Sequence, residues 1–112
     1  MIKIEAIVRP QCADAVVAAL KEAGVRGMTL TEVQGMGAEA GSTQHYRGAE
    51  YTILLHHKVK FEVVAADDDT EKIIQAIIGA ARTGEVGDGK ILVLPIADAI
   101  RIRSGERGRA AL

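Results

Sequence analysis

Alternation of apolar and polar residues predicts strands in several stretches of the chain. Residues 2–8 (IKIEAIV) place apolar side chains at every second position, as in a strand with one buried face. Residues 26–37 are rich in β-branched side chains and predict a second strand. Residues 51–65 read as one long strand, bent near two adjacent histidines. Further on, residues 90–97 (KILVLPIA) predict a buried strand and residues 99–103 (AIRIR) a short final one.

Two other stretches carry apolar residues at helical spacing. The first helix is predicted from Cys12 to Ala23, with Gly24 as its C-terminal stop. The second begins at the acidic run 67–70, whose side chains can accept hydrogen bonds from the first free N–H groups, and is closed by Gly84. The apolar faces consist of Ala13, Val16, Val17 and Leu20 in the first helix and of Ile73, Ile74, Ile77, Ile78 and Ala81 in the second.

The order of elements is therefore strand–helix–strand, a long excursion, and strand–helix–strand. This order predicts one α+β domain over residues 1–112, a ferredoxin-like βαββαβ sandwich with both helices on one face of an antiparallel sheet. The other face of the sheet would then be exposed to water unless another chain packs on it. Ile7 and either Val63 or Val64 are expected on that face, which favours self-association over exposure of the sheet to water.

The connection between the second and third strands, about residues 37–55, is far longer than a hairpin needs. It is polar and rich in glycine, so we expect a flexible loop that contacts a partner. At its centre is YRGAEY, which holds both tyrosines of the chain. Tyr51 is either the anchor of the third strand or, on such a loop, accessible to a modifying enzyme.

Two short motifs have residues suited to binding anions. In TGEVGDGK, residues 83–90, Gly87 and Gly89 allow backbone N–H groups to face an anion and Lys90 adds a charge, although a plain tight turn also explains the motif. In AIRIR, Arg101 and Arg103 lie two apart on the predicted strand and share a face. That pair is suited to phosphate oxygens, and a solvated edge is the alternative.

Composition excludes several classes of function. The chain has 112 residues, a net charge of −1, and mixed charges, so general affinity for nucleic acid or an anionic membrane is not expected. A lone cysteine, Cys12, excludes an internal disulfide and a multi-cysteine zinc site and favours a reducing cytosol. His56 and His57 are adjacent on a strand and point to opposite faces, and His45 lies in the loop, so a metal site is not expected. No nucleophile–base set is visible, which argues against an enzyme.

Together these motifs identify a resemblance. YRGAEY, TGEVGDGKI and RIRSGE, with the opening MIKIEAIVRP and the stretch GVRGMTLTEVQGMG, resemble the PII signal-transduction proteins of nitrogen regulation over essentially the whole chain. The resemblance implies a homotrimer that binds ATP or ADP in clefts between subunits. It also implies a T-loop, about residues 37–55, that docks onto nitrogen-metabolism enzymes or an ammonium channel. Tyr51 would be the residue that a nucleotidyltransferase uridylylates or adenylylates.

The resemblance also assigns roles to particular residues. Lys58 would pair with a carboxylate of 2-oxoglutarate near Gly87, and Glu39 would be a ligand of the magnesium that accompanies ATP. The nucleotide would be bound by Ile7, Thr29, Gly35, Met36, Gly37, Glu62, Val64, Gly87, Asp88, Gly89, Lys90, Arg101 and Arg103.

At the base of the loop the chain departs from the usual family pattern. Glu39 replaces a glutamine and puts negative charge beside a dianionic effector, and Ala38 replaces an arginine that reaches a terminal phosphate. Histidines stand at 56 and 57 in place of a more ordinary pair. The main hypothesis is a cytoplasmic PII-type regulator, recruited to the membrane when its partner is a transporter. The alternative is a divergent paralogue that senses adenine nucleotides together with another small molecule or a metal and serves a different transporter partner.

A third possibility is a small phosphate-handling enzyme on the same sandwich, such as an acylphosphatase. That activity needs a catalytic asparagine, and the chain contains none. RNA binding on the sheet is also disfavoured, because stacking requires aromatic side chains on the strands and Phe61 is nearly alone.

Overall fold

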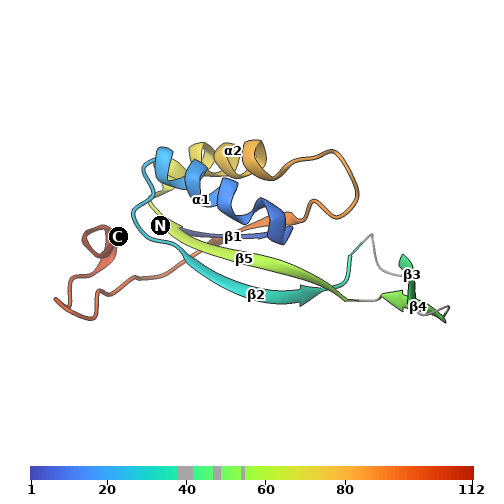
Figure 1. The fold of residues 1–112 in the computed structure, drawn as a ribbon. Helices are drawn as coiled ribbons and strands as arrows, with labels where there is room; N and C mark the ends of the chain where they lie inside the picture. The colour runs from blue at the N-terminus through green and yellow to red at the C-terminus, as the bar shows by residue number, and fades with distance from the viewer. Residues whose placement is uncertain (38–41, 47–48, 54) are drawn as a thin grey trace.

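The computed structural model of the chain describes residues 1–37, 42–46, 49–53 and 55–112. Two helices lie on one face of a four-stranded antiparallel sheet with the order β2-β5-β1-β6 (Figure 1). This strand order confirms the predicted ferredoxin-like α+β sandwich. The elements are β1 (Ile2–Val8), α1 (Ala13–Glu22), β2 (Thr29–Gly35), β5 (His56–Ala65), α2 (Thr70–Ala81) and β6 (Lys90–Pro95).

The core lies between the helices and the sheet, where the predicted faces meet. On β1, the buried side chains are those of the predicted face, such as Ile4 and Ala6, and opposite them on β5 lie Val63 and Phe61. Val16 and Leu20 of α1 and Ile73 and Ile77 of α2 complete the layer from the helix side. Because strand side chains alternate between faces, residues 58, 60, 62 and 64 of β5 lie on the face away from the helices.

The face of the sheet away from the helices carries the apolar residues expected there, with Val64 as the one of the two candidate valines. Ile7 and Val64 are half-buried on the uncovered face, as predicted, whereas Val63 is only 2% exposed and packs under the helices. The uncovered face therefore carries Ile7, Val64 and the charged residues between them.

The ends of α2 differ from the prediction. A short 3-10 turn, Asp67–Asp69, precedes the helix, and neither the turn nor the helix has a side-chain hydrogen bond at its cap. Asp67 instead pairs with the N-terminal ammonium group, at 3.0 Å. The helix ends at Ala81, before Gly84, because Arg82 is already extended.

The long strand predicted over residues 51–65 is two strands. Residues Ala49–Ile53 form β4, which pairs with β3 (Ser42–Tyr46) in a separate two-stranded sheet, and β5 begins only at His56. The interruption lies just before the histidines, where a bend was expected. The connection between β2 and β5, predicted as a long loop, contains this two-stranded hairpin, which lies beyond the ends of β2 and β5 (Figure 1).

Two predictions for the C-terminal part are wrong. β6 was expected to be buried, but it pairs only with β1, and Leu92, Val93 and Leu94 are 37–47% exposed because the strand lies at the edge of the sheet. Residues 99–103 were expected to form a strand. They belong instead to a C-terminal hook, residues 97–112, in which a single bridge joins Ile100 to Arg107 and residues 102–104 turn.

Candidate functional site

The loop that joins α2 to β6, residues 83–90, is held together by the carboxylate of Asp88. That carboxylate accepts hydrogen bonds from the hydroxyl of Thr83 and from the backbone N–H groups of Thr83 and Gly84, both at 2.9 Å. These bonds, the hydroxyl first, lower the pKa of Asp88 to about 2. The loop is therefore held in one conformation by its own side chains.

Two cations tie this loop to the sheet. The Arg9 guanidinium donates to the Val86 carbonyl at 2.7 Å and lies 3.4 Å from the Asp88 carboxylate. The Lys58 ammonium donates to the Gly87 carbonyl at 2.8 Å, although Lys58 is only 8% exposed. A buried lysine needs polar partners, and this hydrogen bond to the loop supplies one.

The backbone at Gly89 lies so close to β1 that only glycine can occupy the position. Its φ is +100°, and a Cβ there would lie 1.7 Å from the carbonyl oxygen of Ile7. Gly87 also has a positive φ, +103°. Glycines with such backbone angles let successive amide groups face a concavity, which is how many phosphate sites are formed.

A cleft of about 390 Å³ opens beside this loop. Its walls come from the end of β1, the end of β2, the start of β5 and the loop itself. Of the lining residues only Glu85 was not singled out from the sequence, although it belongs to the same TGEVGDGK motif. The cleft is lined by Ile7, Gly35, Met36, Gly37, Lys58, Glu85, Gly87, Asp88, Gly89 and Lys90.

The other candidate residues do not line this cleft. Thr29 and Glu62 face each other across the β2–β5 ladder, and Val64 lies opposite Lys3. Lys58 and Val64 are six residues apart on one strand, which corresponds to about 20 Å. Lys3 binds the Glu62 carboxylate at 3.1 Å, and this hydrogen bond lowers the pKa of Glu62.

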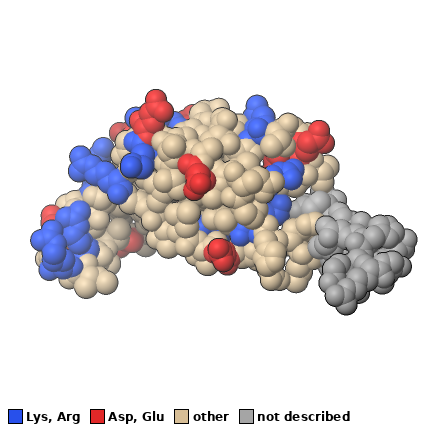
Figure 2. Space-filling view, viewed as in Figure 1, with Lys and Arg blue, Asp and Glu red and all other residues tan. Residues whose placement is uncertain are grey.

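The two arginines of the RIR motif lie further away still, in the hook at the end of the molecule opposite the glycine-rich loop (Figure 1). They do not share a strand face. Arg101 pairs with Glu106 at 3.3 Å and donates to the Leu112 carbonyl, also at 3.3 Å, whereas Arg103 is exposed on the turn. Basic side chains gather at this end of the molecule (Figure 2).

The candidate residues thus form two groups in one chain: those that line the cleft, and those that lie outside it, further along the sheet or in the hook. The cleft group holds the loop and Lys58, and the distal group holds Thr29, Glu62, Val64, Arg101 and Arg103. One chain does not bring the two groups together.

A smaller cavity of about 260 Å³ lies on another side of Lys58. Arg9, His56 and His57 line it together with Lys58 and Val86. Among the residues that the structure describes, no three histidine, cysteine or carboxylate side chains are grouped as metal ligands would be. His45, in β3, contributes only its backbone to the described structure.

Two predicted sites belong to the segment between β2 and β5. Glu39, with Ala38, lies outside the described residues. Tyr51 lies in β4, where its backbone pairs with Gln44, and nothing further of this residue is described. In the described part of the chain, neither helix has the length and apolar character that a membrane span requires.

Known proteins similar to this chain agree with the resemblance seen in the motifs. The profile of the family described as Nitrogen regulatory protein P-II matches residues 1–106. Two proteins named Nitrogen regulatory protein P-II, from Cereibacter sphaeroides and Nostoc punctiforme, are 51% and 48% identical to this chain. Each match covers all 112 residues and the full length of the relative. A protein of the same name from Azospirillum brasilense is 50% identical over the same span. The chain therefore belongs to the P-II family of nitrogen regulatory proteins.

Proposed function

We propose that this chain is a P-II signal transducer that binds ATP or ADP in clefts between subunits of a homotrimer. The observation that carries the proposal is the cleft beside the glycine-rich loop, in which Lys58, Lys90 and the close approach of Gly89 to β1 meet. Two lysines beside a glycine-rich loop match the chemistry of a polyphosphate. The loop residues would hold the phosphates, with Ile7 against the apolar part of the ligand.

The separation of the candidate residues supports a shared site. Arg101 and Arg103 lie in the hook, at the end of the chain's fold opposite the cleft (Figure 1), so they serve a nucleotide only if they complete the cleft of a neighbour. Arg101 and Arg103 would then add charge-assisted hydrogen bonds to the phosphates, and Thr29, Glu62 and Val64 would border the base. A cyclic trimer repeats this head-to-tail contact three times and closes.

The ligand in the cleft would control the segment of about residues 37–55, because Gly35, Met36 and Gly37 form both a wall of the cleft and the start of that segment. A ligand that contacts one arrangement of this segment better shifts the population toward that arrangement. The segment, with Tyr51 as its modification site, would then select nitrogen-metabolism enzymes or an ammonium channel. The protein would act in the cytoplasm and reach the membrane through that channel, as a regulator and not as an enzyme.

Calorimetry tests the effector. Magnesium–ATP is titrated into the protein with and without 2-oxoglutarate. If Lys58 and Gly87 hold the effector, with Glu39 on the magnesium, each ligand strengthens the binding of the other by the same factor.

A second candidate, the divergent paralogue, is favoured by one observation. His56 and His57 line the small cavity that borders Lys58, so they give the effector region imidazole groups of its own. ATP binding without coupling to 2-oxoglutarate is the result expected for this candidate. Restoration of the coupling in a chain with His56→Leu and His57→Leu would assign the difference to these side chains.

A further inference from the structure

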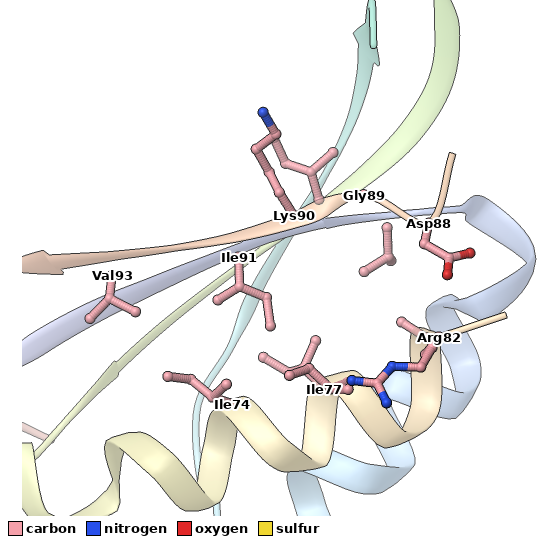
Figure 3. A pocket seen from close by; sticks show the side chains of 12 residues that line it. Ile74, Ile77, Arg82, Asp88, Gly89, Lys90, Ile91 and Val93 are labelled. Atoms are coloured by element: carbon pink, nitrogen blue, oxygen red, sulfur yellow. The ribbon is translucent and has the colours of Figure 1, made fainter. Parts of the chain in front are cut away.

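An apolar groove separates α2 from the edge strand β6 on the helix side of the sheet. Its cavity measures about 360 Å³. Ile91 and Val93 point from β6 toward Ile74 and Ile77 of α2, whereas Lys90 points to the other side of the strand (Figure 3). Val93 remains 47% exposed, so the chain leaves this part of its core open. An apolar opening beside an unpaired strand edge is rarely left to water.

The tip of the C-terminal hook carries the most exposed apolar side chain among the described residues. Ile102 is 100% exposed. The turn that presents it is fixed by backbone hydrogen bonds from Gly105 N–H to the Arg101 carbonyl, at 2.8 Å, and from Arg101 N–H to the Glu106 carbonyl, at 2.9 Å. The hook is therefore a preformed projection with an apolar tip, which lowers the entropy lost when it docks.

The groove and the nucleotide cleft lie on two sides of the same wall. Ile7, Asp88, Gly89 and Lys90 line both of them. Ile102 stands between Arg101 and Arg103 in the sequence, so any contact that brings these arginines to the cleft brings Ile102 to the same wall.

We propose that Ile102 of one subunit docks into the groove between α2 and β6 of the next subunit and thereby positions Arg101 and Arg103 at that subunit's cleft. This inference rests on the proposed function, because it takes the arginines to serve a neighbouring cleft. The occupant is a second copy of the chain, since the hook cannot fill its own groove. The hook projects from the end of the subunit opposite the glycine-rich loop (Figure 1).

Burial of one isoleucine strengthens such a contact by an amount that can be measured. Full burial of a side chain of this size corresponds to roughly 10- to 100-fold in an association constant. Ile102→Asp should weaken subunit association by at least that factor at each interface. Ala110→Asp, which places the same charge elsewhere on the hook, should leave association within about threefold of the wild type.

Disulfide trapping tests the contact itself. Two chains are made in a Cys12→Ser background, one with Ile102→Cys and the other with Val93→Cys, and each carries a different tag. The mixed chains are reassembled and oxidised. Because a disulfide requires the two Cα atoms to lie within about 7 Å, we expect a covalent dimer of the two tagged chains. The matched control pairs Ile102→Cys with Ala18→Cys on the exposed side of α1 and should remain uncrosslinked.

Nucleotide binding is measured on the wild-type chain in parallel. Suppose the oligomer binds ATP but Ile102→Cys does not cross-link to Val93→Cys, or cross-links equally to Ala18→Cys. That result overturns the proposed docking of Ile102 and leaves the proposed function standing. A wild-type chain that does not bind ATP overturns the proposed function, and the cross-link then decides the docking by itself.

Discussion

Replacement of Gly89 by alanine tests the geometry of the glycine-rich loop most severely. The added Cβ would lie 1.7 Å from the Ile7 carbonyl oxygen, half of the 3.4 Å at which ordinary contact begins. The obstructing atoms are backbone, so the ends of β1 and β6 must move apart. The backbone at this position, with φ of +100°, is also strained for any residue that has a side chain.

The two contributions are of similar size. Strain at a positive φ costs about 1–3 kcal/mol, and displacement of a packed backbone costs about 1–3 kcal/mol more. We therefore expect Gly89→Ala to lower the free energy of unfolding by about 2–6 kcal/mol. That is a large part of the roughly 5–15 kcal/mol by which a domain of this size is stable.

Gly84 supplies the matched control. Its φ is +89°, yet no atom lies within 4 Å of the added Cβ, so Gly84→Ala should show the strain alone. Gly87→Ala would meet the Arg9 guanidinium at 3.1 Å, a side chain that can move, and should fall between the two. Urea unfolding at one fixed protein concentration, followed by circular dichroism, measures all three. A Gly89→Ala chain no less stable than Gly84→Ala would refute the reasoning.

Three further predictions concern the site. The pKa of Asp88 is about 2 in the folded chain, against an ordinary 3.8. Its carboxylate therefore stabilises the fold above about pH 4, and this contribution disappears as the pH falls toward 2. Asp88→Asn should flatten the dependence of the unfolding free energy on pH between about 5 and 2, and an unchanged slope would contradict this. Lys58→Gln should abolish the coupling between 2-oxoglutarate and ATP in calorimetry, and a coupling that survives would remove Lys58 from the effector site. Tyr51→Phe should eliminate any nucleotidyl mass added to the protein in cells of changed nitrogen supply, and persistence of that mass would place the modification elsewhere.

Much of the fold was predictable because its signals are local. The alternation in residues 2–8 and the helical spacing around Val16 and Ile77 each specify one buried face, and those faces meet in the core. The strand over residues 51–65 was wrong because both of its halves have strand character. Their separation depends on pairing with different partners, β3 and β2, and this information is not local.

The candidate site could be predicted only in part, because only some of its signals are local in the sequence. The cleft residues around Gly87 come from one motif plus strand ends that the ferredoxin-like order brings together. The AIRIR segment alternates like a strand, but in the structure its only bridge joins Ile100 to Arg107 and the chain turns at residues 102–104. If its arginines serve a neighbouring subunit, as proposed, that role depends on an assembly that no pattern in a single sequence specifies.

The most direct test of a nucleotide site shared between subunits uses two defective chains. Lys90→Ala removes a loop cation from the cleft, and Arg103→Ala removes a hook cation, so each variant alone should bind ATP about 10- to 100-fold more weakly. In mixed trimers, a cleft whose loop comes from the Arg103→Ala chain and whose hook comes from the Lys90→Ala chain contains both wild-type cations. Titration of the reassembled mixture should therefore recover wild-type affinity at one cleft in each mixed trimer. Weak binding at every cleft of the mixture, or a wild-type protein that is monomeric, would contradict the account.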